Sequence, residues 1–186
     1  MGKTIEIIQS QTVTGASVLS VSFTSIPQTY NVLELVMTLR TNASVNMAGL
    51  NFTFNGDNTV SNYFRYFTET YYAGALSQYT YTGNASGNQW LQMPGNTPGG
   101  QTAGNAFGRI IIPNYSQTTL KKSMKLTGGY LIDTSSVANF RSNQRFGSAS
   151  WNSTAAINRI DITSPTATDV FKANTTNFTL FGWQDS

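Results

Sequence analysis

Apolar and polar residues alternate with a period of two along much of this chain, and this pattern constrains the fold more than any other feature. Successive side chains of a β-strand point to opposite faces, so alternation predicts strands with one buried face. In the segment 31–40, for example, every second residue from Leu33 to Leu39 is apolar, while Glu34 and Thr38 lie between them. Helical periodicity is hard to find. The sequence therefore predicts an all-β protein.

About ten short strands are expected, separated by turns rich in Gly, Asn, Ser and Pro. They cover 4–8, 18–26, 31–40, 50–54, 62–67, 107–115, 122–132, 144–152, 157–164 and 177–184. The pair Gly128-Gly129 is interpreted as a bulge or bend, and 135–142 is the one stretch that could hold a short helix. A chain of 186 residues suits a single domain, 1–186. We expect an antiparallel β-sandwich of jelly-roll type.

The composition excludes several classes of chemistry. The chain has no cysteine and no histidine, which removes disulfides, thiolate metal sites and every nucleophile that depends on a histidine base. Only eight acidic residues occur, with no spacing typical of a catalytic pair, although distant carboxylates could still converge as in a glycosidase. We expect no enzymatic activity and no cofactor. Thr, Ser, Asn and Gln make up 73 residues, which predicts a mostly uncharged surface that resists pH and salt.

The net charge is +3, and the one basic cluster is Lys121, Lys122 and Lys125. Nucleic-acid binding requires more clustered charge, so these lysines are interpreted as a solvated strand end and no nucleic-acid partner is expected. The N-terminal residues lack the apolar core of a secretory signal. No apolar run approaches the ~18 residues that a membrane span needs, so a soluble protein without a membrane partner is expected.

The segment "FNGDNTVSNY", residues 54–63, has the composition of either a ligand loop or a turn. Asn55, Asp57 and Asn58 resemble part of a calcium loop, but the further spaced oxygens and closing Glu of an EF-hand are missing. The dipeptide Asn55-Gly56 is a strong signal for the positive backbone angles of a β-hairpin. We therefore expect a hairpin turn and no metal site.

Aromatic residues are concentrated between positions 63 and 90. Such residues could form a sugar-stacking platform or a subunit interface, or they could line the core. Strand alternation predicts that about half of them are buried. The candidate interaction residues are Tyr71, Tyr72, Tyr79, Tyr81 and Trp90.

Five motifs in this order resemble a class of small β-rich virion proteins of tailed bacteriophages, including cyanophages. They are "SIPQTYNVLELVMTLR", "FNGDNTVSNY", "GRIIIPNYS", "WNSTAAINRIDITS" and "FTLFGWQ". The resemblance touches nearly the whole chain, and its motifs are structural rather than catalytic. It implies a virion protein, made in the host cytoplasm and assembled into the particle.

The resemblance leaves two roles open. A capsid decoration (cement) protein would sit on the outer shell as a homotrimer and bind the major capsid protein at capsomer junctions. A tail-fibre or receptor-binding module would instead recognise host surface glycans. The chain shows no repeated or coiled-coil shaft, which favours decoration. The expected contact elements are the glycine-rich loops 82–88 and 94–105 and the N-terminal segment 1–11.

Overall fold

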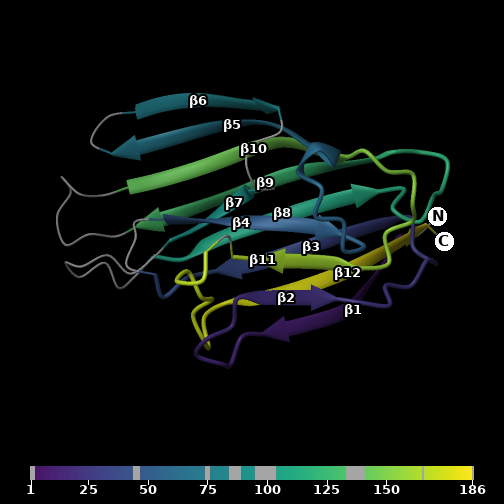
Figure 1. The fold of residues 1–186 in the computed structure, drawn as a ribbon, viewed down its shortest axis with the longest axis horizontal. Coiled ribbons are helices and arrows are strands. Elements are labelled where there is room, and N and C mark those ends of the chain that lie inside the picture. The colour runs from purple at the N-terminus through teal and green to yellow at the C-terminus, as the bar shows by residue number, and fades with distance from the viewer. Residues whose placement is uncertain are drawn as a thin grey trace.

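The computed structural model describes residues 3–43, 47–73, 76–83, 89–94, 104–132, 141–164 and 166–185. Within them lie twelve strands and one short 3-10 helix (Figure 1). They are β1 (Lys3–Thr12), β2 (Ser20–Phe23), β3 (Val32–Leu39), β4 (Met47–Phe54), η1 (Val60–Asn62), β5 (Tyr63–Ala73), β6 (Leu76–Gly83), β7 (Gln89–Pro94), β8 (Ala106–Pro113), β9 (Lys122–Ile132), β10 (Arg141–Trp151), β11 (Ile160–Thr163) and β12 (Asn177–Asp185). The described residues contain two strands more than the ten expected, because β6 and β7 also pair.

The strands form two antiparallel sheets. The larger has the order β1-β12-β3-β8-β9-β10-β5-β6, and the smaller has the order β2-β11-β4-β7. Four pairs are nested along the chain: β1 with β12, β2 with β11, β3 with β8, and β4 with β7. These pairs alternate between the two sheets, which is the connectivity of a jelly roll. The expected all-β jelly-roll sandwich is therefore confirmed.

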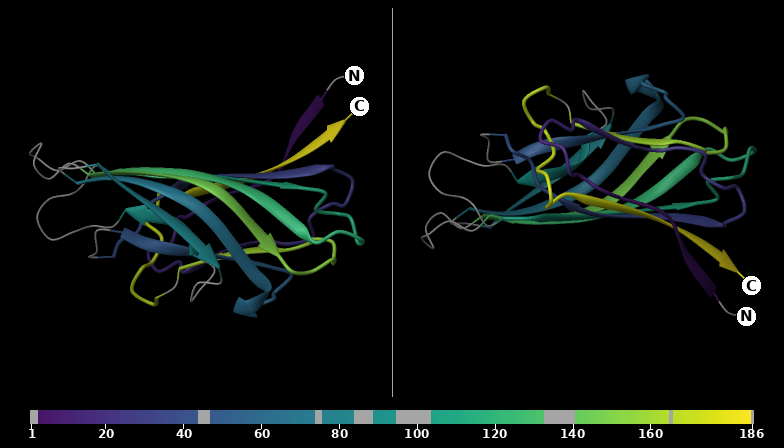
Figure 2. Two further views of the ribbon diagram at one scale, coloured as in Figure 1. Left: turned by 90° about the horizontal axis from the view of Figure 1, so that it is seen from above. Right: turned by 90° about the horizontal axis from the view of Figure 1, so that it is seen from below.

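Two hairpins widen the larger sheet beyond the jelly roll. The hairpin β5–β6 lies within the connection between β4 and β7, and the hairpin β9–β10 lies within the connection between β8 and β11. Strand β9 pairs with β8, and β10 pairs with β5, so all four strands extend the sheet on the same side. The larger sheet consequently has eight strands and the smaller one four. Figure 2 shows the two sheets as separate layers.

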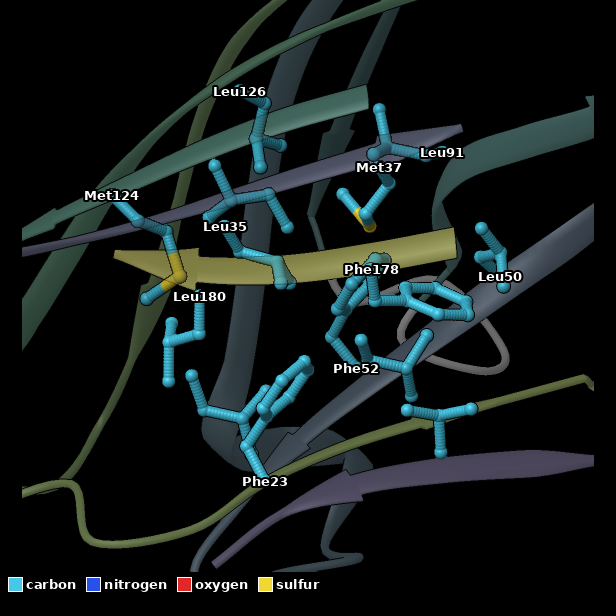
Figure 3. Packing of buried hydrophobic residues seen from close by; sticks show 14 of the residues in the cluster. Phe23, Leu35, Met37, Leu50, Phe52, Leu91, Met124, Leu126, Phe178 and Leu180 are labelled. Atoms are coloured by element: carbon cyan, nitrogen blue, oxygen red, sulfur yellow. The ribbon is translucent and has the colours of Figure 1, made fainter. Parts of the chain in front are cut away.

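The core lies between the sheets and follows the alternation in the sequence. Every second residue of β3, from Leu33 to Leu39, is buried, as are Phe52 and Phe54 of β4. Figure 3 shows Phe23 and Phe52 of the smaller sheet facing Leu35 and its neighbours from the larger sheet. Burial of this continuous apolar cluster is the main force that holds the two sheets together.

The pair Gly128-Gly129 does not form the bulge or bend that the sequence suggested. Strand β9 keeps a regular register with both neighbours here, and Gly128 lies opposite Gly108 of β8. Gly128 and Gly108 instead make room for Leu91 of the smaller sheet: a Cβ atom added at either of these two positions would lie 2.6 Å from a methyl carbon of Leu91. A Cβ atom added at Gly129 would lie 2.6 Å from the carbonyl oxygen of Asn143 on β10. The glycines are therefore packing residues, and the expected irregularity is wrong.

The turn at Asn55-Gly56 has the predicted positive φ angles, 52° and 73°, but it does not close a hairpin. Strand β4 pairs with β11 and β7 in the smaller sheet, whereas β5 belongs to the larger sheet. The segment after Gly56 therefore carries the chain from one sheet to the other. The hairpin prediction is wrong because local turn chemistry specifies the backbone angles and not the partner of the next strand.

Four of the five sequence motifs are hydrogen-bonded to one another. The hydroxyl of Tyr115 in "IPNY" donates to the carbonyl of Pro27 in "SIPQTY", and the amide of Gln28 donates to the carbonyl of Ile157, 3.0 Å away. The side-chain oxygen of Asn55 accepts from the backbone amides of Asn158 and Arg159. Three of these motifs thus contribute side chains, and a fourth contributes backbone groups, to one hydrogen-bonded junction of loops.

Several expectations fall on undescribed parts of the chain. Most of the possible helix 135–142 and most of both glycine-rich loops lie outside the described residues. Within the part of the chain that the structure describes, no helix has the length and apolar character needed to cross a membrane.

Candidate functional site: the outer face of the larger sheet

Four large aromatic side chains are exposed on the face of the larger sheet that points away from the core. They are Phe64 and Tyr66 on β5, Phe107 on β8 and Phe146 on β10, with exposed fractions of 43%, 56%, 55% and 52%. We call this set the aromatic face. Its members alternate with buried residues on their own strands, as Phe107 does with Ala106 and Gly108. Alternation therefore positions all four rings on the same side of the sheet.

The strand register places three of these rings close together. Phe146 lies opposite Thr68, and Tyr66 lies opposite Ser148, so Phe146 and Tyr66 are diagonal neighbours. Diagonal positions on adjacent strands are about 7–8 Å apart. Phe64 precedes Tyr66 by two residues on the same strand, which places it a further ~6.8 Å along. The three rings thus form a continuous row on β5 and β10, and Phe107 lies two strands away.

A shallow groove of about 300 Å³ runs beside this row. Its lining residues come from β8, β9 and β10: Ile111, Pro113, Ser123, Met124, Lys125, Gly147 and Ser148. Lys125 and Ser148 lie between Ile111 of β8 and Tyr66 of β5, because Ile111 is opposite Lys125, Lys125 is opposite Ser148 and Ser148 is opposite Tyr66. The groove and the row of rings form one surface.

The charges on this face are few. Glu34 of β3 is buried beneath the guanidinium of Arg109 of β8, with which it forms an ion pair. Lys125 is exposed between Ile111 and Ser148, and no ion pair to it occurs among the described residues. Most remaining positions carry Thr, Ser or Gln. The face can therefore make apolar and hydrogen-bonded contacts with little dependence on charge.

The predicted interaction residues lie at the far edge of the same sheet and in the smaller sheet. Tyr71 and Tyr72 belong to β5, Tyr79 and Tyr81 to β6, and Trp90 to β7. The structure brings Tyr71 and Tyr72 of β5 alongside Ser77 and Leu76 of β6.

Only one of these five side chains lies within the described set. Tyr79 is exposed, and its backbone lies opposite Glu69. The side chains of Tyr71, Tyr72, Tyr81 and Trp90 are outside the described residues, so their role stays a prediction.

The expectation that the aromatic-rich segment divides between core and surface is met where side chains are described. Tyr63 and Phe67 are buried, whereas Phe64 and Tyr66 are exposed. None of the four residues of the aromatic face was among the predicted interaction residues, and Phe107 and Phe146 lie outside the aromatic-rich segment. Strand alternation could have placed both rings on the outer face. Phe107 alternates together with the polar residue Arg109, and Phe146 alternates together with Gln144 and Ser148.

The oxygens of Asp57 are used within the fold. Its carboxylate accepts hydrogen bonds from the Trp151 indole, the Asn62 amide and the Thr59 backbone amide, at 2.8–2.9 Å. Partial burial raises the pKa of Asp57, but these hydrogen bonds outweigh burial and lower it to about 2. No group of three or more acidic residues that could hold a metal ion occurs among the described residues. The carboxylate of Asp57 therefore joins three parts of the fold.

Other acidic residues are also paired. The carboxylate of Glu69 binds the guanidinium of Arg145 at 2.7 Å and accepts from the amide of Asn143, all three being buried. The carboxylate of Asp161, which is also buried, binds the guanidinium of Arg159 at 2.8 Å and accepts from the Ser22 hydroxyl. These carboxylates neutralise arginines and do not converge on one another.

Lys122 corrects the interpretation of the basic cluster. Lys121 and Lys125 are exposed, but Lys122 is buried, and its ammonium donates to the carbonyls of Gln117, Leu120 and Thr154. Burial lowers the pKa of Lys122. These hydrogen bonds hold the ammonium inside the fold, so its charge is not available on the surface. The interpretation as a solvated strand end is therefore wrong for Lys122.

No protein-family model matches the sequence, and no curated protein matches it. Among solved structures, the carbohydrate-binding module CBM40 of the Ruminococcus gnavus IT-sialidase bound to α2,6-sialyllactose is 11% identical, with a TM-score of 0.33 over 94% of this chain and 92% of that chain. The same module bound to α2,3-sialyllactose is 11% identical, with a TM-score of 0.32 over 94% and 91%. TM-scores this low support no argument about function.

Proposed function

We propose that the protein is a non-catalytic component of a tailed-bacteriophage particle that binds the outer shell through its aromatic face, as a capsid decoration protein does. The observation that carries this proposal is the row formed by Phe64, Tyr66 and Phe146, exposed on a wide sheet with few charges. The order of the sequence motifs supports membership of a virion. The major capsid protein is the proposed partner.

The mechanism is adhesive. Half-exposed aromatic rings are favoured in protein interfaces, because each buries a large apolar area at a small cost in side-chain entropy. A partner that covers Phe64, Tyr66 and Phe146 removes that area from water. Binding to assembled capsomers and not to separated ones stabilises the assembly by mass action, so resistance of the shell to dissociation rises with occupancy.

Glycan binding by a tail-fibre or receptor-binding module is the second candidate, and the groove beside Tyr66 favours it. A sugar ring has apolar faces that stack on aromatic rings and hydroxyl groups that hydrogen-bond polar side chains. The groove offers Ser123, Ser148 and Lys125 next to such a ring. In this case the protein would sit at a tail tip and bind host surface glycans.

The test uses phage particles that lack the protein, to which the purified chain is added back. We expect the wild-type chain to bind the shell and to raise the temperature at which the particles release DNA. The double substitution Tyr66→Ser and Phe146→Ser should reduce bound copies at least tenfold. Leu120→Ser, which changes an equally exposed apolar residue on a different segment, should bind like the wild type.

A glycan array probed with the same three proteins distinguishes the second candidate. Glycan binding that is lost in the double variant Tyr66→Ser and Phe146→Ser, together with no binding to the shell, would favour the receptor-binding role over capsid decoration. If the double variant binds the shell as well as the wild type does, the aromatic face is not the contact surface. Hydrolysis of a glycan on the array would contradict the non-catalytic assignment.

A further inference from the structure

Strand β1 is an open edge of the larger sheet. It pairs with β12 on one side, and no other described strand pairs with it. Figure 2 shows β1 and the end of β12 running out beyond the two packed layers as a two-stranded ribbon. An edge strand presents a row of unpaired backbone N–H and C=O groups, which can pair with another strand.

The exposed side of this ribbon is apolar. Ile5 and Ile7 of β1 have exposed fractions of 53% and 64%, and Ile7 is the most exposed large hydrophobic residue of the described chain. They lie opposite Trp183 and Phe181 of β12, which are partly buried. Two isoleucines exposed to water on an open edge are unfavourable for an isolated chain. Natural edge strands usually carry charges or proline at such positions, which prevents pairing with another strand.

The regular part of this edge is short. The register between β1 and β12 shifts between Ile7 and Gln9, which marks a β-bulge at Ile8. A bulge interrupts ladder pairing, so an added strand can pair regularly only with Lys3–Ile7. Within that segment Glu6 is the single acidic residue, and its carboxylate accepts a hydrogen bond from the Tyr30 hydroxyl at 2.7 Å. The edge therefore fits a strand of about five residues.

We propose that the β1 strand of a second copy of this chain covers this edge, in antiparallel pairing around a two-fold axis at Ile5. Residues opposite each other in an antiparallel pair lie on the same face, so Ile5 faces Ile5 of the other copy and Thr4 faces Glu6. This register contains no opposed like charges. A centre at Glu6 would oppose two carboxylates, which is destabilising, and a centre at Thr4 would pair only three residues.

A second copy suits this edge because its own β1 has the same short regular length and the same apolar side. Pairing aligns the outer faces of the two larger sheets, so Ile5, Ile7 and Phe181 of both copies form one apolar cluster across the axis. The proposal does not depend on the proposed function. It differs from the trimer that the sequence resemblance implies, because a two-fold contact gives two copies.

A single cysteine tests the register. The chain has no cysteine, so Ile5→Cys introduces its sole thiol. Directly opposed residues of an antiparallel pair have Cα atoms about 4.5–5.5 Å apart, within the range of a disulfide. We expect mild oxidation to convert Ile5→Cys almost completely to a covalent dimer. Leu120→Cys, equally exposed on another segment, should remain mostly uncrosslinked at the same protein concentration.

Sedimentation of the full chain tests the assembly. The wild type should have the mass of two copies, Ile7→Lys should shift to one copy with at least a tenfold weaker self-association, and Leu120→Lys should remain at two. A wild-type mass of one or three copies would overturn the proposal. Ile5→Cys that crosslinks no faster than Leu120→Cys would also overturn it, whatever the mass.

Discussion

Single polar residues hold the loops of this sandwich in place, and Asp57 shows how. It lies in the segment that crosses between the sheets and accepts hydrogen bonds from the Trp151 indole and the Asn62 amide. Trp151 also stacks on Tyr63, with ring centroids 6.5 Å apart. One carboxylate thus joins the crossing segment to the end of β10.

The pKa of Asp57 predicts how stability depends on pH. Its folded pKa of about 2 is below the ordinary value of 3.8, so its contribution is present above pH 4 and is lost as pH falls from about 4 to about 2. Asp57→Asn should lower the free energy of unfolding by about 1–2 kcal/mol at pH 7, allowing for partial solvent exposure. Urea unfolding at pH 7 and pH 2.5 checks this. An equal loss at both pH values would contradict it.

Lys122 gives a second prediction at this scale. Lys122→Met removes the donor to three carbonyls, of Gln117, Leu120 and Thr154, and should lower the free energy of unfolding by about 2–3 kcal/mol. Lys121→Met is the matched control, because Lys121 is the adjacent lysine and is exposed, and it should change stability by less than about 0.5 kcal/mol. Chemical denaturation measures both. Equal losses of stability from the two substitutions would show that the hydrogen bonds of the buried ammonium do not stabilise the fold.

At the scale of elements, the position of β7 depends on small residues in a different sheet. Leu91 of β7 packs against Gly108 of β8 and Gly128 of β9, which lie opposite each other. The smaller sheet therefore approaches the larger one closely at its β7 edge. The widened sheet could not accept this contact if either glycine had a side chain.

Gly128→Ala should accordingly lower the free energy of unfolding by about 1–3 kcal/mol, because its Cβ would overlap a methyl group of Leu91. Leu91→Ala alone should also destabilise, through the cavity it leaves. The double variant should lose less than the sum of the two losses, since each change relieves the other. A double-mutant cycle by thermal unfolding tests this. Strict additivity would mean that the two residues do not share the contact.

The strands differ in how well the sequence predicted them. The strands with clear alternation, such as β3 and β4, were predicted with the correct buried residues. Strands β6 and β7 were not predicted, and they complete the two sheets by pairing with β5 and β4. The aromatic face was not predicted, since none of its residues was a candidate interaction residue, and Phe107 and Phe146 enter it from strands far from Tyr66 in the sequence.

At the scale of the whole molecule, the outer face is wide and nearly neutral. Glu34 neutralises Arg109, and Lys125 is the remaining charge between β8 and β10. Contacts made there depend on apolar area and hydroxyl groups more than on charge.

Shell binding through this face should therefore depend weakly on salt. Between 0.05 and 0.5 M NaCl, screening affects exposed charges, and we expect the dissociation constant to change less than about threefold. Titration of fluorescent protein onto particles at several salt concentrations measures this. Lys125→Ala should flatten the remaining dependence. A decrease in affinity of more than about tenfold would indicate that charge, and not the aromatic row, drives binding.

The sequence by itself determined the fold class, the buried side of the clearest strands and the absence of histidine or cysteine chemistry, because these follow from local alternation and composition. Only the tertiary structure decided which strands pair. It turned the Asn55-Gly56 turn from a hairpin into a crossing between sheets, placed Leu91 against two glycines, and gathered Phe64, Tyr66 and Phe146 on one face. Strand pairing depends on contacts between distant segments, which no local pattern specifies.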